Sequence, residues 1–598
     1  MFKPVEDRLD YGKILSPPAG FKCDFAIGTT YSLDLEALLG VPLALFLSEE
    51  MDGALSDNPI YILEGLRKSA DNFALFCEGG QIKVPSNANA VFALLENSVF
   101  QIALKNEKSF HPKVWLIKYV NNAGKSLYRY IILSRNLTFD RSWDVVAVLE
   151  GEANRKKTLK NQPLIDFLAY LQRSITDGKK KKRIDKIAGE LEYVHFKTGD
   201  QYFTDFSFIP IGIGEDYNFS PTAAIDKFKT LLVISPFLSR DTVIELDKLS
   251  LKNSNKTLIT RRSEIPKLTN DLLNSIEVYC LKETIIDGEE AISESEAALS
   301  ELQKQDIHAK VYFKYKYPEH SLYIGSANCS TSAWNGNVEF MLQLKYEKRG
   351  FNISQVVDEL FCRNGKEIDE RLNPFERILS IPDATIVEDD VQQRLQKAIK
   401  RICCSRTKAS VSESGSRFSI TIDFDMRYVV PDIDFKIAAL GGGKAAKIES
   451  LTIIPGLDLL ALSEFYIITA TLGEESLQRI IKIRTEGIPG DRDKAIFKSV
   501  IRDKNTFLRY IAFLLCDDYL LAALDQMELN KAASSKWNLH SYDMPVLYEN
   551  MLRAIAESPQ KLQEIEYVIN RVNDSEIIPP EFIKLYSKFL LASRRIKS

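Results

Sequence analysis

Short apolar runs and amphipathic segments alternate through roughly the first 170 residues of the chain. Alternation of apolar and polar residues with a period of two is typical of a half-buried strand, whereas an apolar stripe with a period of 3.6 is typical of a helix. The pattern predicts strands at 22–31, 72–77, 99–104, 114–120 and 127–133, and helices at 34–47 and 164–175. The turn sequence Asn-Asn-Ala-Gly at 121–124 predicts a hairpin between the last two strands. A mixed α/β architecture follows.

The same alternation resumes after about residue 202. Here the pattern predicts strands at 231–236, 257–260, 276–281, 311–315 and 321–324, and helices at 241–249 and 289–305. The last two strands flank a turn and repeat the strand, turn, strand order of the first segment, about two hundred residues further on. The chain therefore contains an internal duplication.

The pattern changes again beyond about residue 370. A helix is predicted at 391–404 and a Ser-rich connector at 405–416, followed by strands at 417–426, 448–454 and 465–472 and by helices from about 495 onward. We expect three domains: a first half at 1–192, a second half at 193–372, and an accessory domain at 373–598 that is β-rich and then helical. The sequence does not reveal the job of the accessory domain.

Composition and charge exclude few classes of function. With 45% apolar and 27% charged residues the chain has the composition of a soluble globular protein. A net charge of −4 argues against binding nucleic acid over the whole surface but permits a local basic patch. The basic run at 179–183 is interpreted as a solvated helix end or linker, with a phosphate-steering patch as the alternative.

The spacing of the cysteines and the apolar stretches indicate whether a metal site or a membrane segment is expected. The 8 cysteines include no C-x-x-C pair, so we expect no metal site and reduced thiols. The first residues lack the apolar core of a signal peptide, and the apolar stretch at 510–524 is interrupted by Asp517 and Asp518. We expect a cytoplasmic protein that does not enter a membrane.

Two short motifs with the same chemistry occur in the duplicated segments: His111-Pro112-Lys113 and His308-Ala309-Lys310. In an extended chain, residues i and i+2 point to the same side, so each His and Lys would project together. The chain has 5 histidines, and two of them occupy these positions. An inert repeated fold with two structural histidines is the alternative interpretation.

Each motif is followed by further polar residues in the same order. A small-polar turn ends in Asn136 in the first copy and in Asn328 in the second, and Ser134 and Ser326 stand two residues before these asparagines. Amide and hydroxyl groups are uncharged donors that suit phosphate oxygens. An acid at the start of an apolar strand comes next, and such a carboxylate can hold an imidazole in one tautomer. The acids are Asp144, after Trp143, and Glu339, after Trp334.

These paired motifs resemble the phospholipase D superfamily, most closely the tyrosyl-DNA phosphodiesterases and related bacterial nucleases, over roughly residues 20–360. Members with the full motif have an Asp five residues after the Lys, where this chain has Lys118 and Tyr315. The missing Asp, the retained Asn and the segment 326–334 (Ser-Ala-Asn-Cys-Ser-Thr-Ser-Ala-Trp) are similar to the tyrosyl-DNA phosphodiesterases. The departure weighs against lipid phospholipase activity, not against phosphodiester chemistry. The resemblance implies an α/β fold of two pseudo-symmetric mixed-sheet α/β/α halves that share one active site, plus a C-terminal α+β accessory domain.

The resemblance also implies a mechanism without a metal ion or other cofactor. His111 would attack phosphorus to form a phosphohistidine, and His308 would protonate the leaving oxygen and then activate water. The halves are pseudo-symmetric, so the opposite order stays open. Glu339 would orient His111 and Asp144 would orient His308. The residues expected to hold phosphate oxygens are Lys113, Lys310, Asn136 and Asn328, with Ser134, Ser326 and Arg135 as further substrate contacts and Arg261 and Arg262 nearby.

Three functions are compatible with these motifs. The leading one is a nuclease, with DNA favoured over RNA as the substrate. A lipid phosphodiesterase or transphosphatidylase is the second. The third is a partner-activated module that docks another protein through 373–598.

By resemblance, stand-alone bacterial nucleases of this kind serve genome and antiviral defence beside an ATPase or helicase partner. A homo-oligomer is also left open. The chain has no P-loop of its own, because the glycine-rich turn at 441–445 lacks the leading Gly and the Ser or Thr.

Overall fold

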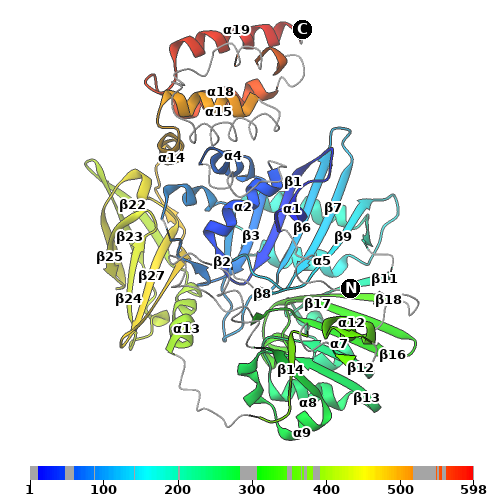
Figure 1. The fold of residues 1–598 in the computed structure, drawn as a ribbon. Coiled ribbons are helices and arrows are strands. Elements are labelled where there is room, and N and C mark those ends of the chain that lie inside the picture. Colours follow the sequence, from blue (N-terminus) through cyan, green and yellow to red (C-terminus); the bar gives the residue numbers. More distant parts are fainter. Residues whose placement is uncertain are drawn as a thin grey trace, which may run out of the picture.

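Two mixed sheets, one from each half of the duplication, lie next to each other, and a C-terminal β region and a group of helices complete the fold (Figure 1). The structure is a computed structural model. It describes residues 11–46, 59–86, 88–139, 142–199, 202–282, 306–346, 353–364, 367–368, 373–381, 391–515, 547, 551–554 and 560–596. The predicted helix at 289–305 lies outside these residues.

The first sheet has seven strands in the order β10-β9-β7-β6-β1-β3-β5. β1 pairs parallel with β3, and β3 with β5, whereas the other neighbours are antiparallel. The strands are β1 (Phe21–Thr30), β3 (Phe73–Glu78), β5 (Val99–Ile102), β6 (Val114–Asn121), β7 (Ser126–Leu133), β9 (Val146–Ala153) and β10 (Val194–Thr198).

The second sheet repeats this arrangement with one additional edge strand, in the order β11-β18-β17-β16-β12-β13-β14-β21. β12, β13 and β14 are parallel, and β16 is antiparallel to β12 as β6 is to β1. The duplication inferred from the sequence is therefore a repeat of sheet order and strand direction. The strands are β11 (Phe203–Ile211), β12 (Phe228–Ile234), β13 (Ser250–Ile259), β14 (Glu277–Leu281), β16 (Val311–Lys316), β17 (Glu319–Gly325), β18 (Glu339–Tyr346) and β21 (Phe375–Ile378).

Alternating side chains of the first sheet enter two separate cores. Phe25 and Ile27 of β1 pack with the helices α5 (Gln162–Gln172) and α6 (Gly178–Leu191), whereas Ala26 packs with α2 (Leu35–Phe46) on the other face. Burial of both faces explains why the central strands have nearly continuous apolar sequences. The first half thus has the expected α/β/α layers.

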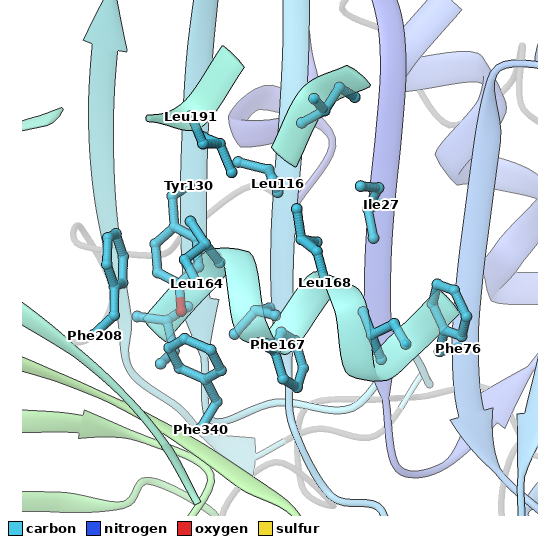
Figure 2. Packing of buried hydrophobic residues seen from close by; sticks show 14 of the residues in the cluster. Ile27, Phe76, Leu116, Tyr130, Leu164, Phe167, Leu168, Leu191, Phe208 and Phe340 are labelled. Carbon is cyan, nitrogen blue, oxygen red and sulfur yellow. The ribbon is translucent and has the colours of Figure 1, made fainter. Parts of the chain in front are cut away.

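One hydrophobic cluster joins the two halves (Figure 2). Phe167 of α5 lies edge-to-face with Phe340 of β18, with 4.9 Å between ring centroids, and Tyr130 of β7 packs in the same way on Phe208 of β11 at 4.8 Å. Large aromatic rings contribute most of the apolar area buried in such an interface. The close packing holds the strand ends of both sheets in a fixed relative position.

The C-terminal region is attached to the first half through a shared sheet. The strands β2 (Leu33–Asp34) and β4 (Ile82–Lys83) of the first half join β28 (Glu475–Lys482), β27, β24 and β25 in one six-stranded sheet. The other C-terminal strands form a second sheet, β26-β23-β22-β29. The remaining strands are β22 (Lys408–Ser414), β23 (Arg417–Asp423), β24 (Asp434–Ala439), β25 (Gly442–Lys447), β26 (Leu451–Leu457), β27 (Phe465–Leu472) and β29 (Thr485–Glu486).

Helices begin and end the C-terminal region. α13 (Val391–Cys403) comes before its first strand. The terminal helices share a core with α4 (Pro59–Ser69) of the first half. They are α14 (Arg492–Val500), α15 (Lys504–Leu515), α18 (Gln560–Val572) and α19 (Pro580–Ile596). No helix in the described ranges is long and apolar enough to cross a bilayer.

The structure differs from the sequence-based expectation at three places. Residues 442–445 of the glycine-rich segment lie in β25 and not in a turn. The basic run 179–183, by contrast, lies at the start of α6 as expected of a helix end, and only its Lys180 is buried, where it donates to Phe73 O at 2.8 Å. The Ser-rich segment expected as a connector contains β22, because residues 408–414 pair in a continuous register with β23. β21 pairs with β14, so the second sheet extends one strand beyond the predicted boundary at 372/373. The predicted domain limits otherwise stay predictions.

Candidate active site

The first half-site lies immediately before β6, in an extended segment that pairs with the second half. Phe110 forms a parallel bridge with Val338, and His111 N donates to Val338 O at 2.8 Å. The imidazole Nδ1 of His111 donates to Glu339 Oε2 at 2.9 Å, and Lys113 Nζ lies 3.0 Å from His111 Nε2. A carboxylate only accepts, so Nδ1 carries the proton and Nε2 presents a lone pair.

The second half-site repeats this arrangement before β16. Backbone pairing between β15 (Asp306–Ile307) and β8 (Ser142–Trp143) brings it against the first half. The backbone N–H groups of His308 and Ala309 both donate to Trp143 O, at 3.0 and 2.9 Å. His308 Nδ1 lies 3.3 Å from Asp144 Oδ1. Each histidine therefore contacts an acid from the opposite half, in the pairs that the resemblance implies.

Ser134 and Ser326 hold the two acids. Ser326 Oγ donates to Glu339 Oε2 at 2.5 Å and accepts from Phe340 N at 3.0 Å. Ser134 Oγ donates to Asp144 Oδ1 at 2.7 Å and accepts from Val145 N at 2.9 Å. Both serines are fully buried, and both hydroxyl protons are used by the acids. They are therefore not available as the phosphate donors that the sequence suggested, and they act as supports for the carboxylates.

The two lysines are buried close to both acids. Burial lowers the pKa of Lys113 to about 7, although the carboxylates of Glu339 and Asp144 act in the opposite direction. Burial, together with the charge of Lys113, also holds the pKa of Lys310 well below its usual range. Two desolvated lysines that act on each other electrostatically favour an anion near both of them.

The two histidines have depressed basicity for the same reason. Burial lowers the pKa of His111, and the charges of Lys113 and Lys310 add to the effect. Burial and the charge of Lys310 likewise lower the pKa of His308. Lys310 acts on His111 and Lys113 acts on His308, which shows that the two half-sites lie within electrostatic reach of each other. The pKa of Asp144 is lowered, because hydrogen bonds from His308, Ser142 and Ser134 outweigh its burial.

The two asparagines lie in the loops that follow β7 and β17, and their surroundings differ. Asn136 Oδ1 accepts from Ser32 N at 3.4 Å. Asn328 Oδ1 is buried and has no hydrogen-bond partner within the described part of the chain. Arg135 Nη2 donates to Thr138 O at 3.2 Å, so this arginine braces its own loop. Arg262 forms an ion pair with Glu376 of β21, which does not connect it to the histidines.

Four residues that contact or support the half-sites were not predicted from the sequence. Tyr31 lies edge-on to His111, with 4.9 Å between the ring centroids. Asn337 Nδ2 donates to Glu339 Oε1 at 3.1 Å. Glu78 Oε2 accepts from Phe110 N at 2.7 Å, and Lys400 of α13 pairs with Glu78 Oε1 at 2.6 Å. Asn337 could have been found from the sequence, because it lies two residues before Glu339. Tyr31, Glu78 and Lys400 could not, because only the tertiary structure brings them to the first half-site.

No three His, Cys, Asp or Glu side chains within the described ranges gather in a way that would hold a metal ion.

Comparisons with known proteins give structural likenesses only. No protein-family model and no curated protein matches the chain. The yeast tyrosyl-DNA phosphodiesterase aligns with 58% of this chain and 87% of its own, at 13% identity and a TM-score of 0.36. A histidine-to-alanine variant of the yeast enzyme aligns with 58% and 88%, at 13% identity and a TM-score of 0.37. The polyphosphate kinase of Porphyromonas gingivalis aligns with 65% of this chain and 50% of its own, at 13% identity and a TM-score of 0.32.

Proposed function

We propose that this chain is a phosphodiesterase that cleaves nucleic acid, DNA in preference to RNA, through a phosphohistidine intermediate and without a metal ion. The observation that carries the proposal is the pair of crossed contacts, His111 with Glu339 and His308 with Asp144, beside two buried lysines. Two imidazoles, each held at Nδ1, leave two Nε2 atoms for chemistry at one phosphorus.

In the first step, His111 Nε2 attacks phosphorus and the bond from phosphorus to the leaving oxygen breaks. The leaving oxygen takes a proton from the imidazolium of His308. Lys113 supports this assignment, because its ammonium lies 3.0 Å from His111 Nε2 and favours the neutral imidazole that a nucleophile needs. The negative phosphodiester raises the pKa of the nearby His308 and so favours its acid form.

In the second step, the neutral His308 takes a proton from water while the water oxygen attacks phosphorus. The bond between phosphorus and His111 Nε2 breaks, and the free histidine is restored. Both steps add negative charge to the non-bridging oxygens, which must be offset in the transition state. Lys113 and Lys310 supply the positive charge that offsets it, and Asn136 and Asn328 supply hydrogen-bond donors. Together they take the role that metal ions have in two-metal nucleases.

The preference for nucleic acid over lipid is supported by the absence of the Asp that the full motif has five residues after each Lys. Lys118 and Tyr315 stand at these two positions. Lys118 pairs with Glu190 at 2.8 Å, and Tyr315 stacks on His320 at 4.3 Å, so both replacements take part in local packing. The chain thus keeps the Asn-containing motif and uses the Asp position for structure. This departure matches the resemblance to the tyrosyl-DNA phosphodiesterases.

The test is cleavage of labelled single- and double-stranded DNA and RNA with excess EDTA, with phosphatidylcholine vesicles as the lipid arm. We expect DNA cleavage that survives EDTA and is lost in His111→Ala. His195→Ala is the matched control, because His195 lies on the edge strand β10, where its Nε2 contacts Lys156 O at 2.8 Å. An adduct between protein and labelled strand, stable to alkali and labile to acid, should form in His308→Ala but not in His111→Ala. Release of the lipid headgroup without DNA cleavage would contradict the proposal.

The biological setting stays a separate proposal. A role in genome defence beside an ATPase or helicase partner, in the cytoplasm, is suggested by resemblance alone. Co-purification of the native assembly and its mass in solution test for such a partner and for a homo-oligomer.

A further inference from the structure

Phe237 is an exposed aromatic residue at the end of the second sheet that carries His308 and Lys310. It follows β12, whose last residue, Ile234, pairs with Val311 of β16. The register places 235–237 beside the segment that precedes Val311, which contains the second motif. The side chain of Phe237 is 42% exposed. A single exposed apolar side chain is common on protein surfaces, so its surroundings decide its meaning.

The backbone around Phe237 is fixed to the active-site loop. Ser235 Oγ donates to Phe237 O at 2.8 Å and accepts from Cys329 N, the residue after Asn328, at 2.8 Å. Leu238 forms a parallel bridge with Cys329. The ring is therefore presented from a rigid loop, and little conformational entropy is lost when it binds a partner.

The first half contains the same hydrogen-bond frame, but its aromatic residue, Tyr31, stands one position earlier and lies against His111. Thr30 Oγ1 donates to Ser32 O at 2.8 Å and accepts from Leu137 N, the residue after Asn136, at 3.0 Å. Leu33 bridges Leu137 as Leu238 bridges Cys329. Thr30 thus corresponds to Ser235, and Ser32 corresponds to Phe237. The backbone of Ser32 contacts Asn136, which places the corresponding Phe237 next to the loop of Asn328. At this position the first half has the small Ser32, and the second half has the large, exposed ring of Phe237.

An arginine completes the feature. The guanidinium carbon of Arg261 lies 4.9 Å from the centroid of the Phe237 ring. Arg261 Nε donates to Ile307 O at 2.9 Å, which is the residue before His308. The arginine therefore connects the ring to the catalytic segment. Because the planar cation covers one face of the Phe237 ring, the opposite face is the one on which another ring can stack.

We propose that Phe237 and Arg261 form a subsite for one unpaired nucleobase of the strand, next to the scissile phosphate at His308. The inference rests on the proposed function and narrows its substrate to single-stranded or frayed nucleic acid, because a base inside a duplex has no free face. Stacking on an aromatic side chain accepts every base, so the subsite selects strandedness and not sequence.

Binding is the test, because it does not depend on turnover. Fluorescence anisotropy is measured with labelled single strands and with strands that carry one abasic residue at successive positions, all in the His111→Ala background. We expect Phe237→Leu to weaken binding of the intact strand by about 5- to 100-fold, whereas Phe237→Trp restores it. An abasic residue at one position should weaken the parent by a similar factor and should add little in Phe237→Leu. Tyr317→Leu is the control, since Tyr317 is 80% exposed in the turn between β16 and β17, at the opposite end of these strands from Lys310.

The outcomes separate this inference from the proposed function. Equal affinity of Phe237→Leu and its parent, or an equal loss for intact and abasic strands, overturns the subsite while cleavage by the wild type still supports the function. Binding that depends on Phe237 without any cleavage supports the subsite and contradicts the function. Absence of binding to every strand overturns both.

Discussion

His111 Nδ1 donates to Glu339 Oε2 at 2.9 Å, although the two residues lie 228 positions apart in the chain. Its counterpart joins His308 to Asp144 over 164 positions. Each half of the duplication therefore supplies a histidine and also the acid that orients the other half's histidine. Neither half contains both a histidine and the acid that contacts it, so we expect the chemistry to depend on the packing between the halves.

Glu339→Gln tests the orienting role of the acid. Glutamine keeps the size of the side chain but can present its amide nitrogen to His111 Nδ1, which favours the wrong tautomer. We expect the rate of cleavage to fall by about 100- to 10,000-fold with little change in substrate affinity. Single-turnover kinetics and binding, measured separately, check this split. An unchanged rate would show that the contact is only structural.

Ser134→Ala and Ser326→Ala distinguish support of the acids from binding of phosphate. Each substitution leaves a buried carboxylate with one hydrogen bond fewer, which costs about 1–3 kcal/mol of unfolding free energy. Denaturant unfolding measures this loss. We also expect a shift in the pH profile of kcat with KM nearly unchanged. A rise in KM with normal stability would instead show that the serines contact the substrate.

Lys113→Met should stabilise the protein while it abolishes cleavage. The folded protein holds the pKa of Lys113 at about 7, below its ordinary 10.5, so between these values the unfolded chain binds more protons. The charge of Lys113 therefore destabilises the folded state at and below about pH 7, and this cost fades as the pH rises toward 10.5. We expect Lys113→Met to raise Tm most near neutral pH and least near pH 10. A Tm difference that grows with pH would contradict this explanation.

Lys400→Met tests whether the C-terminal region positions the first half-site. Lys400 pairs with the buried Glu78, and it also donates to Lys108 O at 2.6 Å. Glu78 in turn accepts from the backbone of Phe110, next to His111. Removal of the ammonium leaves a buried carboxylate without its partner, so we expect lower stability and a lower kcat, partly rescued by Lys400→Arg.

Lys397→Met is the matched control for that experiment. Lys397 lies one helical turn before Lys400 on α13 and pairs with Glu107 at 3.2 Å, but both side chains of this pair are exposed. An exposed pair of this kind contributes about 0–1 kcal/mol. Equal effects of the two substitutions on kcat would argue against a positioning role for Lys400.

The sequence by itself determined the residue types and their order. Both His-x-Lys motifs, the turn asparagines and the acids were visible, because local alternation and short spacing follow from backbone geometry within one strand or turn. Most strands of the two sheets were predictable for the same reason. Periodicity did not identify β22, because its Ser-rich sequence has the composition of a turn and only pairing with β23 makes it a strand.

Only the tertiary structure decided which groups meet. The approach of Lys400 to Glu78 joins segments that are distant in the chain, whereas the contacts of Ser134 and Ser326 with the acids and of Phe237 with Arg261 join neighbouring strands and loops. Such contacts depend on the packing of sheets and helices, which no local pattern records. Spacing along the chain shows which side chains could share a face, whereas long-range packing sets their distances and their exposure to water, and these set their pKa values and their chemistry.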